Sequence, residues 1–255
     1  MAETRIQLCG RLVVVIEGIR LESRLPARQG RILFAYIATN RIRPVTRDQL
    51  ADALWPGEPP SATESALSAL LSKLRRAIGR EHLMGRHELQ LVLPNDALVD
   101  LEAAEEAIHR AEAAVSRTDW IGAWPASRVA LHTASRGFLV GLDGPWVESQ
   151  RRRVHDLRVR ALEAVAETGL GMGAHELRSV ERSARTLIEL EPFRERGYQY
   201  LMRALAEQGN AAEALRVYER LRMVLRDELG AAPGTETQRL HRQLLAPAIG
   251  VSAPA

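Results

Sequence analysis

The sequence contains a single cysteine, Cys9, so no disulfide bond can form within the chain. Such sparse use of cysteine is typical of proteins in a reducing compartment. The first ten residues lack the basic and then apolar layout of a secretory signal. No apolar run approaches the roughly 18 residues that a membrane-spanning helix needs. We therefore expect a cytoplasmic protein that has no membrane partner.

Patterns for catalysis, metal binding and cofactor binding are also missing. The 7 histidines are scattered, and they form neither an H-E-x-x-H motif nor a cluster with cysteine. No nucleophile with a base and an orienting group can be identified. Gly169, Gly171 and Gly173 follow no predicted strand, so we interpret them as a flexible loop between helices and not as a nucleotide site. We expect no enzyme activity, no metal and no cofactor.

Aromatic residues are scarce at 4%, so the core must be built from aliphatic side chains. With 255 residues, the chain is long enough for two domains. Residues 1–95 contain 14 basic and 9 acidic side chains, whereas residues 96–255 contain 21 basic and 23 acidic ones. The first third therefore has the charge balance that suits a polyanionic partner.

The order of predicted elements in this basic third is that of a winged helix. Residues 5–22 predict two or three short antiparallel strands, and residues 28–39 predict a helix. Thr46 is a predicted cap for a short helix, Arg47–Leu54, and a longer helix is predicted to open at Ser61 or Thr63 and to end at Gly79. Residues 87–93 and 97–99 then predict a β-hairpin. In a winged helix, the third helix enters the major groove of DNA.

The predicted third helix has two distinct faces at 100° per residue. One face is apolar, with Leu67, Leu71, Leu74 and Ile78, and can pack on the other helices. The opposite face is a polar stripe flanked by cations, made of Ser61, Ser65, Ser68, Ser72 and Arg76, with Lys73 and Arg75 at its edges. Small hydroxyl side chains permit close approach to DNA, and an arginine can contact guanine through two hydrogen bonds. The alternative is an ordinary solvated surface helix.

From Asp100 onward, every segment has a helical period, and we expect helices of 12–25 residues. One segment matches a tetratricopeptide repeat, with Tyr198, Leu201, Ala214 and Tyr218 at the expected offsets. The fold class is therefore mainly α: an N-terminal winged helix-turn-helix with a small β-sheet, then an all-α helical repeat domain. We expect the limits of these parts to be 1–97 and 98–248, with a disordered tail at 249–255.

Several motifs resemble those of the Streptomyces antibiotic regulatory protein family. Residues 64–79 resemble the third helix of its winged domain, as do Arg28–Arg31 and Asp52–Pro56 upstream. The second half resembles its bacterial transcriptional activator domain in four segments, namely 144–148, 151–153, 189–195 and 209–228. The resemblance implies an OmpR-type winged helix and tetratricopeptide-like repeats. It also implies a transcriptional activator that binds direct repeats at promoters as a homodimer, recruits RNA polymerase and controls biosynthetic gene clusters in actinobacteria.

The expected interface with double-stranded DNA comprises Arg47, Ser61, Ser65, Ser68, Ser72, Lys73, Arg75, Arg76, Arg86 and His87. The loop containing Trp55, Gly57 and Glu58 either faces the σ or α subunit of RNA polymerase or is a simple turn. The helical domain offers a place for a protein or small-ligand effector. We interpret Arg151–Arg153 as a solvated helix face or as a contact for acidic partners or DNA. We expect Trp146 to be a core anchor.

An alternative function is a protein-interaction scaffold whose winged helix no longer reads DNA. The sequence departs from the family pattern at Leu70, where a polar residue is common, and at His87–Leu89, where a Gly-Tyr pair is common. Both positions lie at or near the expected DNA surface, and repeats of the tetratricopeptide type bind partner peptides in a concave groove.

Overall fold

The computed structural model describes residues 3–57 and 60–246. The chain forms two compact units. The first unit contains the described residues up to Glu106 together with His132–Arg158, and the second contains Ala107–Leu131 and the described residues from Val159 onward. The expected tail, 249–255, lies outside the described residues.

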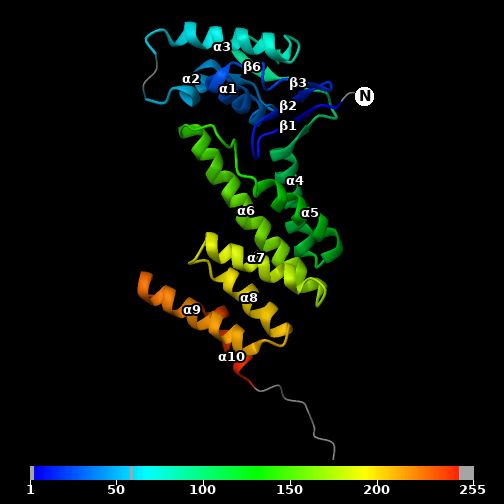
Figure 1. The fold of residues 1–255 in the computed structure, drawn as a ribbon, viewed down its shortest axis with the longest axis vertical. Coiled ribbons are helices and arrows are strands. Elements are labelled where there is room, and N and C mark those ends of the chain that lie inside the picture. Colours follow the sequence, from blue (N-terminus) through cyan, green and yellow to red (C-terminus); the bar gives the residue numbers. More distant parts are fainter. Residues whose placement is uncertain (1–2, 58–59, 247–255) are drawn as a thin grey trace, which may run out of the picture. The chain divides into compact units, whose positions relative to one another are not determined.

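The N-terminal region contains two small sheets beside its helices (Figure 1). Strands β1 (Arg5–Gln7), β2 (Val13–Ile16) and β3 (Ile19–Arg20) are antiparallel, as the sequence predicts. Strand β7 (Leu98–Val99) pairs in parallel with β1. The second sheet has the order β4 (Val45–Thr46), β6 (Glu88–Leu91) and β5 (Leu83–Met84).

The predicted hairpin between residues 87–93 and 97–99 is therefore wrong. The hairpin is formed by β5 and β6, with Leu83 opposite Leu91, and β7 leaves this sheet to join β1. The sequence prediction failed because alternation of apolar residues marks a strand but does not identify the strand with which it pairs.

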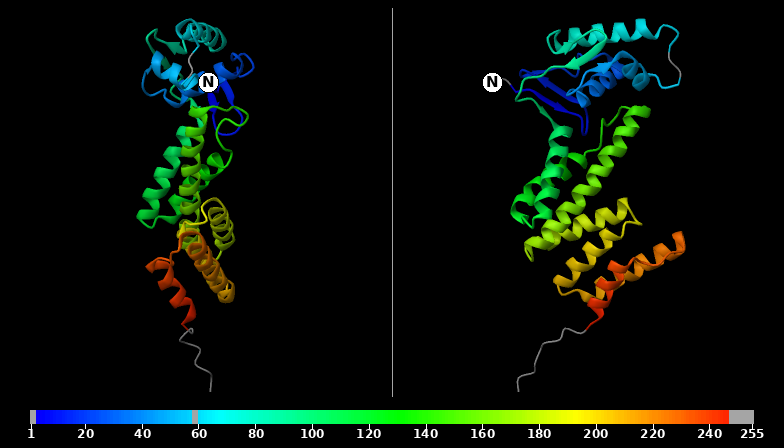
Figure 2. Two further views of the ribbon diagram at one scale, coloured as in Figure 1. Left: turned by 90° about the vertical axis from the view of Figure 1, so that its left-hand side faces the viewer. Right: turned by 180° about the vertical axis from the view of Figure 1, so that it is seen from behind.

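Three helices complete a winged helix: α1 (Ala27–Thr39), α2 (Arg47–Leu54) and α3 (Thr63–Ile78). In Figure 2, α3 lies at the top of the first unit with the β5–β6 hairpin beside it. Thr46 caps α2 in a reciprocal capping box with Gln49, as its position predicts. Helix α3 begins at Thr63, so Ser61 lies in the preceding turn and is not part of the helical stripe.

The start of the helical region is joined to the N-terminal sheet by a buried carboxylate. Asp100 is the first residue of α4 (Asp100–Ser116), and it accepts hydrogen bonds from the backbone nitrogen atoms of Leu8 at 2.7 Å and Cys9 at 3.1 Å. Arg136 also donates to Asp100 at 3.0 Å. Desolvation by burial raises the pKa of Asp100, against the hydrogen bonds and the arginine that lower it.

Trp146 anchors the first turn of α6 (Pro145–Met172) within the first unit. Its ring centroid lies 5.1 Å from that of Tyr36 on α1 and 5.7 Å from that of Phe138. Phe138 itself forms an isolated β-bridge with Cys9. Trp146 thus packs on two aromatic rings as an anchor, although its side chain is only half-buried.

The remaining helices are labelled in Figure 1. They are α5 (Trp120–Ala134), α7 (Leu177–Leu190), α8 (Glu195–Glu207), α9 (Ala211–Leu229) and α10 (Thr235–Leu245). The four repeat residues Tyr198, Leu201, Ala214 and Tyr218 are buried, and the hydroxyl of Tyr198 donates to the carbonyl of Pro192 at 3.0 Å. The predicted range of helix lengths, 12–25 residues, was too narrow, because α6 has 28 residues and α10 has 11.

Two of the glycines assigned to a flexible loop are instead helical. Gly169 and Gly171 lie in α6, where they allow other groups to approach closely. A Cβ atom on Gly171 would lie 2.3 Å from the ring of Trp120, and one on Gly169 would lie 2.6 Å from Val180. Gly173 has φ of +82° and follows the helix. These glycines therefore serve packing and helix termination.

The triplet Arg151–Arg153 is not a uniformly solvated face. Arg151 donates to the carbonyl of Leu142 at 2.7 Å and to that of Phe138 at 3.3 Å, so it holds the segment before α6. Arg153 pairs with Glu105 at 2.7 Å, and Arg152 is exposed. The sequence shows the three charges, but only the fold places the backbone carbonyls and Glu105 beside two of them.

Candidate nucleic-acid interface

Helix α3 presents the predicted polar stripe as one exposed face. Ser65, Ser68, Ser72, Lys73 and Arg76 are exposed. The opposite face is buried through Leu67, Leu71, Leu74 and Ile78. Leu70, which departs from the family pattern, is half-buried and so only partly reaches the surface.

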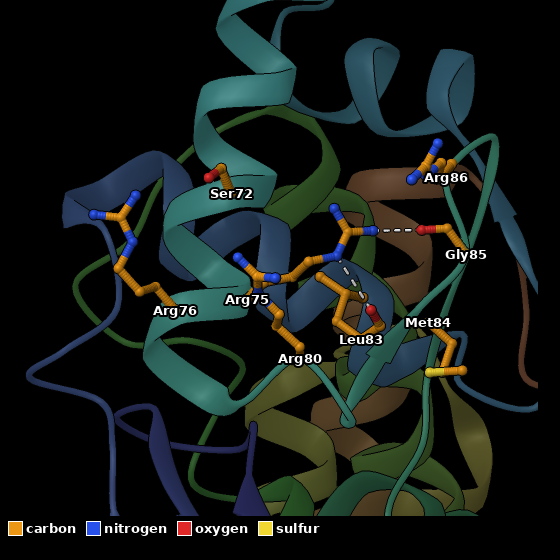
Figure 3. A pocket seen from close by; sticks show the side chains of 8 residues that line it. All are labelled: Ser72, Arg75, Arg76, Arg80, Leu83, Met84, Gly85 and Arg86. Carbon is orange, nitrogen blue, oxygen red and sulfur yellow. Dashed lines mark hydrogen bonds between the residues drawn. The ribbon is translucent and has the colours of Figure 1, made fainter.

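A basic groove of about 510 Å³ lies between the last turns of α3 and the β5–β6 hairpin (Figure 3). It is lined by Ser72, Arg75, Arg76, Arg80, Leu83, Met84, Gly85 and Arg86. Four of these side chains are arginines, and none is acidic. Such a surface favours binding of an anion with several charges, such as the phosphate backbone of a nucleic acid.

Arg75 crosses from α3 to the hairpin and does not stand at the edge of the stripe as predicted. Its Nε atom donates to the carbonyl of Leu83 at 3.2 Å, and its Nη2 atom donates to the carbonyl of Gly85 (Figure 3). It therefore fixes the hairpin against the helix that carries the polar stripe.

The charges around Arg75 repel one another. Burial lowers the pKa of Arg75, and the nearby guanidinium groups of Arg47, Arg80 and Arg86 lower it further. A cluster of like charges of this kind is relieved by a bound polyanion.

Arg47, another predicted contact, is already paired within the protein. Its Nη2 atom lies 2.8 Å from a carboxylate oxygen of Glu64 and donates to the hydroxyl of Ser68 at 2.7 Å. The Glu64 side chain is 71% exposed, so this acid stands on the same surface as the polar stripe. A phosphate that binds Arg47 must compete with Glu64.

Arg76 also lines a second hollow, of about 290 Å³, together with Arg24, Pro26, Lys73 and Ala77. Arg76 thus belongs to both hollows, whereas Lys73 belongs to this one alone. Arg24 and Arg80 were missed in the sequence. The position of Arg80 directly after the helix-ending Gly79 could have placed it near the end of α3. Nothing near Arg24 in the sequence indicates that it lies beside α3.

The tip of the hairpin carries Arg86 and His87, and both are exposed. The turn depends on Gly85, which has φ of +86° and whose Cβ position would lie 1.8 Å from the carbonyl oxygen of Glu88. No side chain fits there, so a glycine is required to bring Arg86 beside the groove.

The loop between α2 and α3 is only partly described. Trp55 ends α2 and is half-buried, and Gly57 is exposed with φ of +81°. Glu58 lies outside the described residues. A contact of this loop with RNA polymerase stays a prediction.

Residues 99–245 match the model of the bacterial transcriptional activator domain, which is more than half of the chain. The chain belongs to this family. Among its relatives, the regulatory protein AfsR of Streptomyces coelicolor is 35% identical over 219 residues, which is 85% of this chain. The regulatory protein DnrI of Streptomyces peucetius is 27% identical over 86% of this chain and 84% of its own length. The resemblance to the Streptomyces antibiotic regulatory proteins is confirmed.

A solved structure of Mycobacterium tuberculosis EmbR in complex with a low-affinity phosphopeptide has the same fold. The TM-score is 0.83 at 24% identity, over 96% of this chain and 65% of EmbR. This likeness confirms the predicted fold class, a winged helix followed by a helical domain. The chain spans about a fifth of the length of AfsR, since the match covers 22% of that protein.

Among the described residues, none of the helices has both the length and the apolar character needed to cross a membrane. In the same part of the chain, no group of three or more histidine, cysteine, aspartate or glutamate side chains is placed to hold a metal ion.

Proposed function

We propose that this protein is a sequence-specific regulator of transcription that binds double-stranded DNA through α3 and the β5–β6 hairpin. The observation that carries the proposal is the groove lined by Arg75, Arg76, Arg80 and Arg86, which contains no acid and lies beside the polar stripe. Membership of an activator family supports activation over repression.

In this proposal, α3 lies in the major groove with its serine hydroxyls close to the bases. Arg76 lies on the exposed stripe and between the two hollows, where it suits a contact with two hydrogen bonds to guanine. Lys73, Arg80 and Arg86 bind phosphates on either side. Each phosphate contact contributes about −0.9 to the slope of log affinity against log salt concentration.

The test compares Arg76→Ala with Lys73→Ala in the full chain. A duplex selected from a random library serves as the cognate site, and a duplex with one changed base pair serves as the mismatched site. Arg76→Ala should cost about 1–3 kcal/mol and relax discrimination at one position, whereas Lys73→Ala should weaken both duplexes alike and lower the salt slope by about one.

Arg182→Ala is the matched control, because Arg182 is an exposed arginine on α7 outside the winged helix. It should leave the affinity for both duplexes unchanged. If Arg76→Ala and Lys73→Ala behave like this control, α3 does not bind DNA as proposed. The alternative function, a scaffold without DNA readout, then stands, and pull-down of a partner by the full chain tests it.

We further propose that two chains bind direct repeats in promoters as a homodimer, because two half-sites require two recognition helices. The loop at Trp55 and Gly57 then recruits RNA polymerase. Relatives in Streptomyces suggest target genes for secondary metabolites. Sedimentation of the chain with one-site and two-site duplexes tests the stoichiometry, and a one-to-one complex on the two-site duplex contradicts the dimer.

A further inference from the structure

A separate cavity, of about 400 Å³, lies in the first unit between the end of α5 and the first half of α6. Its polar lining includes Arg136, Arg151, His155 and Arg158, and its apolar lining includes Phe138, Val140 and Val154. No carboxylate lines it. The volume falls within the range of small-molecule sites in proteins, which also combine an apolar wall with a few polar groups.

The three arginines of this cavity differ in their partners. Arg136 is bound to Asp100 at 3.0 Å and to Gln7 at 3.1 Å. Arg151 is bound to two backbone carbonyls and pairs with Asp143 at 3.3 Å. Arg158, by contrast, has neither an ion pair nor a hydrogen bond within the described part of the chain.

Two donors at this cavity are buried and without an acceptor. The Nε atoms of Arg158 and Arg136 are both shielded from solvent, and no described residue accepts a hydrogen bond from either. Leaving a buried donor unpaired is unfavourable, and such groups are rare in folded proteins. Because Arg158 lines the cavity and has no acidic partner in the described part of the chain, its positive charge is available to an anionic ligand.

We propose that this cavity binds a small organic anion. Its carboxylate or phosphate head binds the guanidinium of Arg158, and its apolar body lies against Phe138, Val140 and Val154. An oxyanion head supplies the negative charge that the guanidinium of Arg158 lacks among its neighbours, and an arginine binds such a head more strongly than a neutral donor does. The apolar wall favours a ligand with a hydrocarbon or aromatic body over a bare inorganic anion.

This site is separate from the proposed DNA surface, and its test does not depend on DNA binding. The full chain is titrated calorimetrically with phenyl phosphate, phenylacetate, inorganic phosphate and benzyl alcohol. Nitrogen-15 labelling of arginine lets the Nε–H signal of Arg158 report a ligand that binds its guanidinium group. Saturable binding of phenyl phosphate or phenylacetate, with a shift of that signal, is the expected result, and the tighter of the two identifies the head group.

The variant Arg158→Gln removes the charge, and Arg152→Gln is its matched control on the same helix. We expect Arg158→Gln to weaken binding at least about tenfold, as the loss of a charge-assisted hydrogen bond predicts, and Arg152→Gln to bind as the unchanged chain does. Circular dichroism and thermal unfolding establish that both variants fold.

Three results would overturn the proposal. The first is that no anion of the set binds saturably to the unchanged chain. The second is that Arg158→Gln, although folded, binds as Arg152→Gln does. The third is that inorganic phosphate or benzyl alcohol binds as tightly as the anions with an aromatic body, because one half of the proposed recognition is then absent.

Discussion

The hydrogen bonds of Arg75 predict that one side chain controls the position of the whole β5–β6 hairpin. Arg75→Met keeps an unbranched apolar stem and removes the guanidinium group that binds the carbonyls of Leu83 and Gly85. A hydrogen bond from a charged donor contributes about 1.5–3 kcal/mol when buried. Because Arg75 is half-buried and Gly85 is exposed, we take about 1 kcal/mol for each.

Relief of the repulsion from Arg47, Arg80 and Arg86 offsets part of this loss. The free energy of local opening of the hairpin should therefore fall by about 1–1.5 kcal/mol, which is roughly a tenfold faster amide exchange. The reporter is the amide of Val92, which donates to the carbonyl of His82 at 2.9 Å. The internal control is the amide of Leu98, which donates to Thr4 in the other sheet.

The substitution Arg75→Lys distinguishes the role of Arg75 in positioning the hairpin from the role of its positive charge. Lysine keeps the positive charge but lacks the planar group that reaches both carbonyls, so Val92 should again exchange faster while the salt slope of DNA binding stays unchanged. If exchange at Val92 is unaffected by either substitution, or if Val92 and Leu98 accelerate equally, Arg75 does not position the hairpin.

Three further predictions concern other parts of the chain. Gly171→Ala should destabilise the protein by about 1–2 kcal/mol in urea unfolding, because the new Cβ atom meets the ring of Trp120, and unchanged stability would refute the close contact. Glu64→Gln should tighten DNA binding about twofold to fivefold at low salt by freeing Arg47, and anisotropy titrations that show weaker binding would contradict this. Burial raises the pKa of Asp100 in the folded state, so the contribution of Asp100 to stability should increase as the pH falls through that pKa. The unfolding free energy of the unchanged chain minus that of Asp100→Asn should therefore be larger at about pH 4 than at about pH 7. A smaller difference at about pH 4 would contradict this direction.

The sequence alone determined the elements whose pattern is local. The apolar residues Leu67 to Ile78 repeat at helical spacing, so they predicted both the buried face of α3 and the polar face opposite it. Thr46 predicted the start of α2, because an N-cap acts on the first turn of its own helix. The burial of Tyr198 and Tyr218 followed from repeat spacing in the same way.

The tertiary structure decided which groups meet across long distances in the chain. Strand β7 pairs with β1, which lies more than 90 residues earlier, and no alternation pattern could identify that partner. Arg75 binds the hairpin because folding places the carbonyls of Leu83 and Gly85 within its reach, although its position on the helix suggested a phosphate contact. Position 171 requires a glycine because the ring of Trp120 lies where a Cβ atom would be. In each case, the partner is selected by packing and by the need to satisfy buried polar groups, and these requirements exist only once the chain has folded.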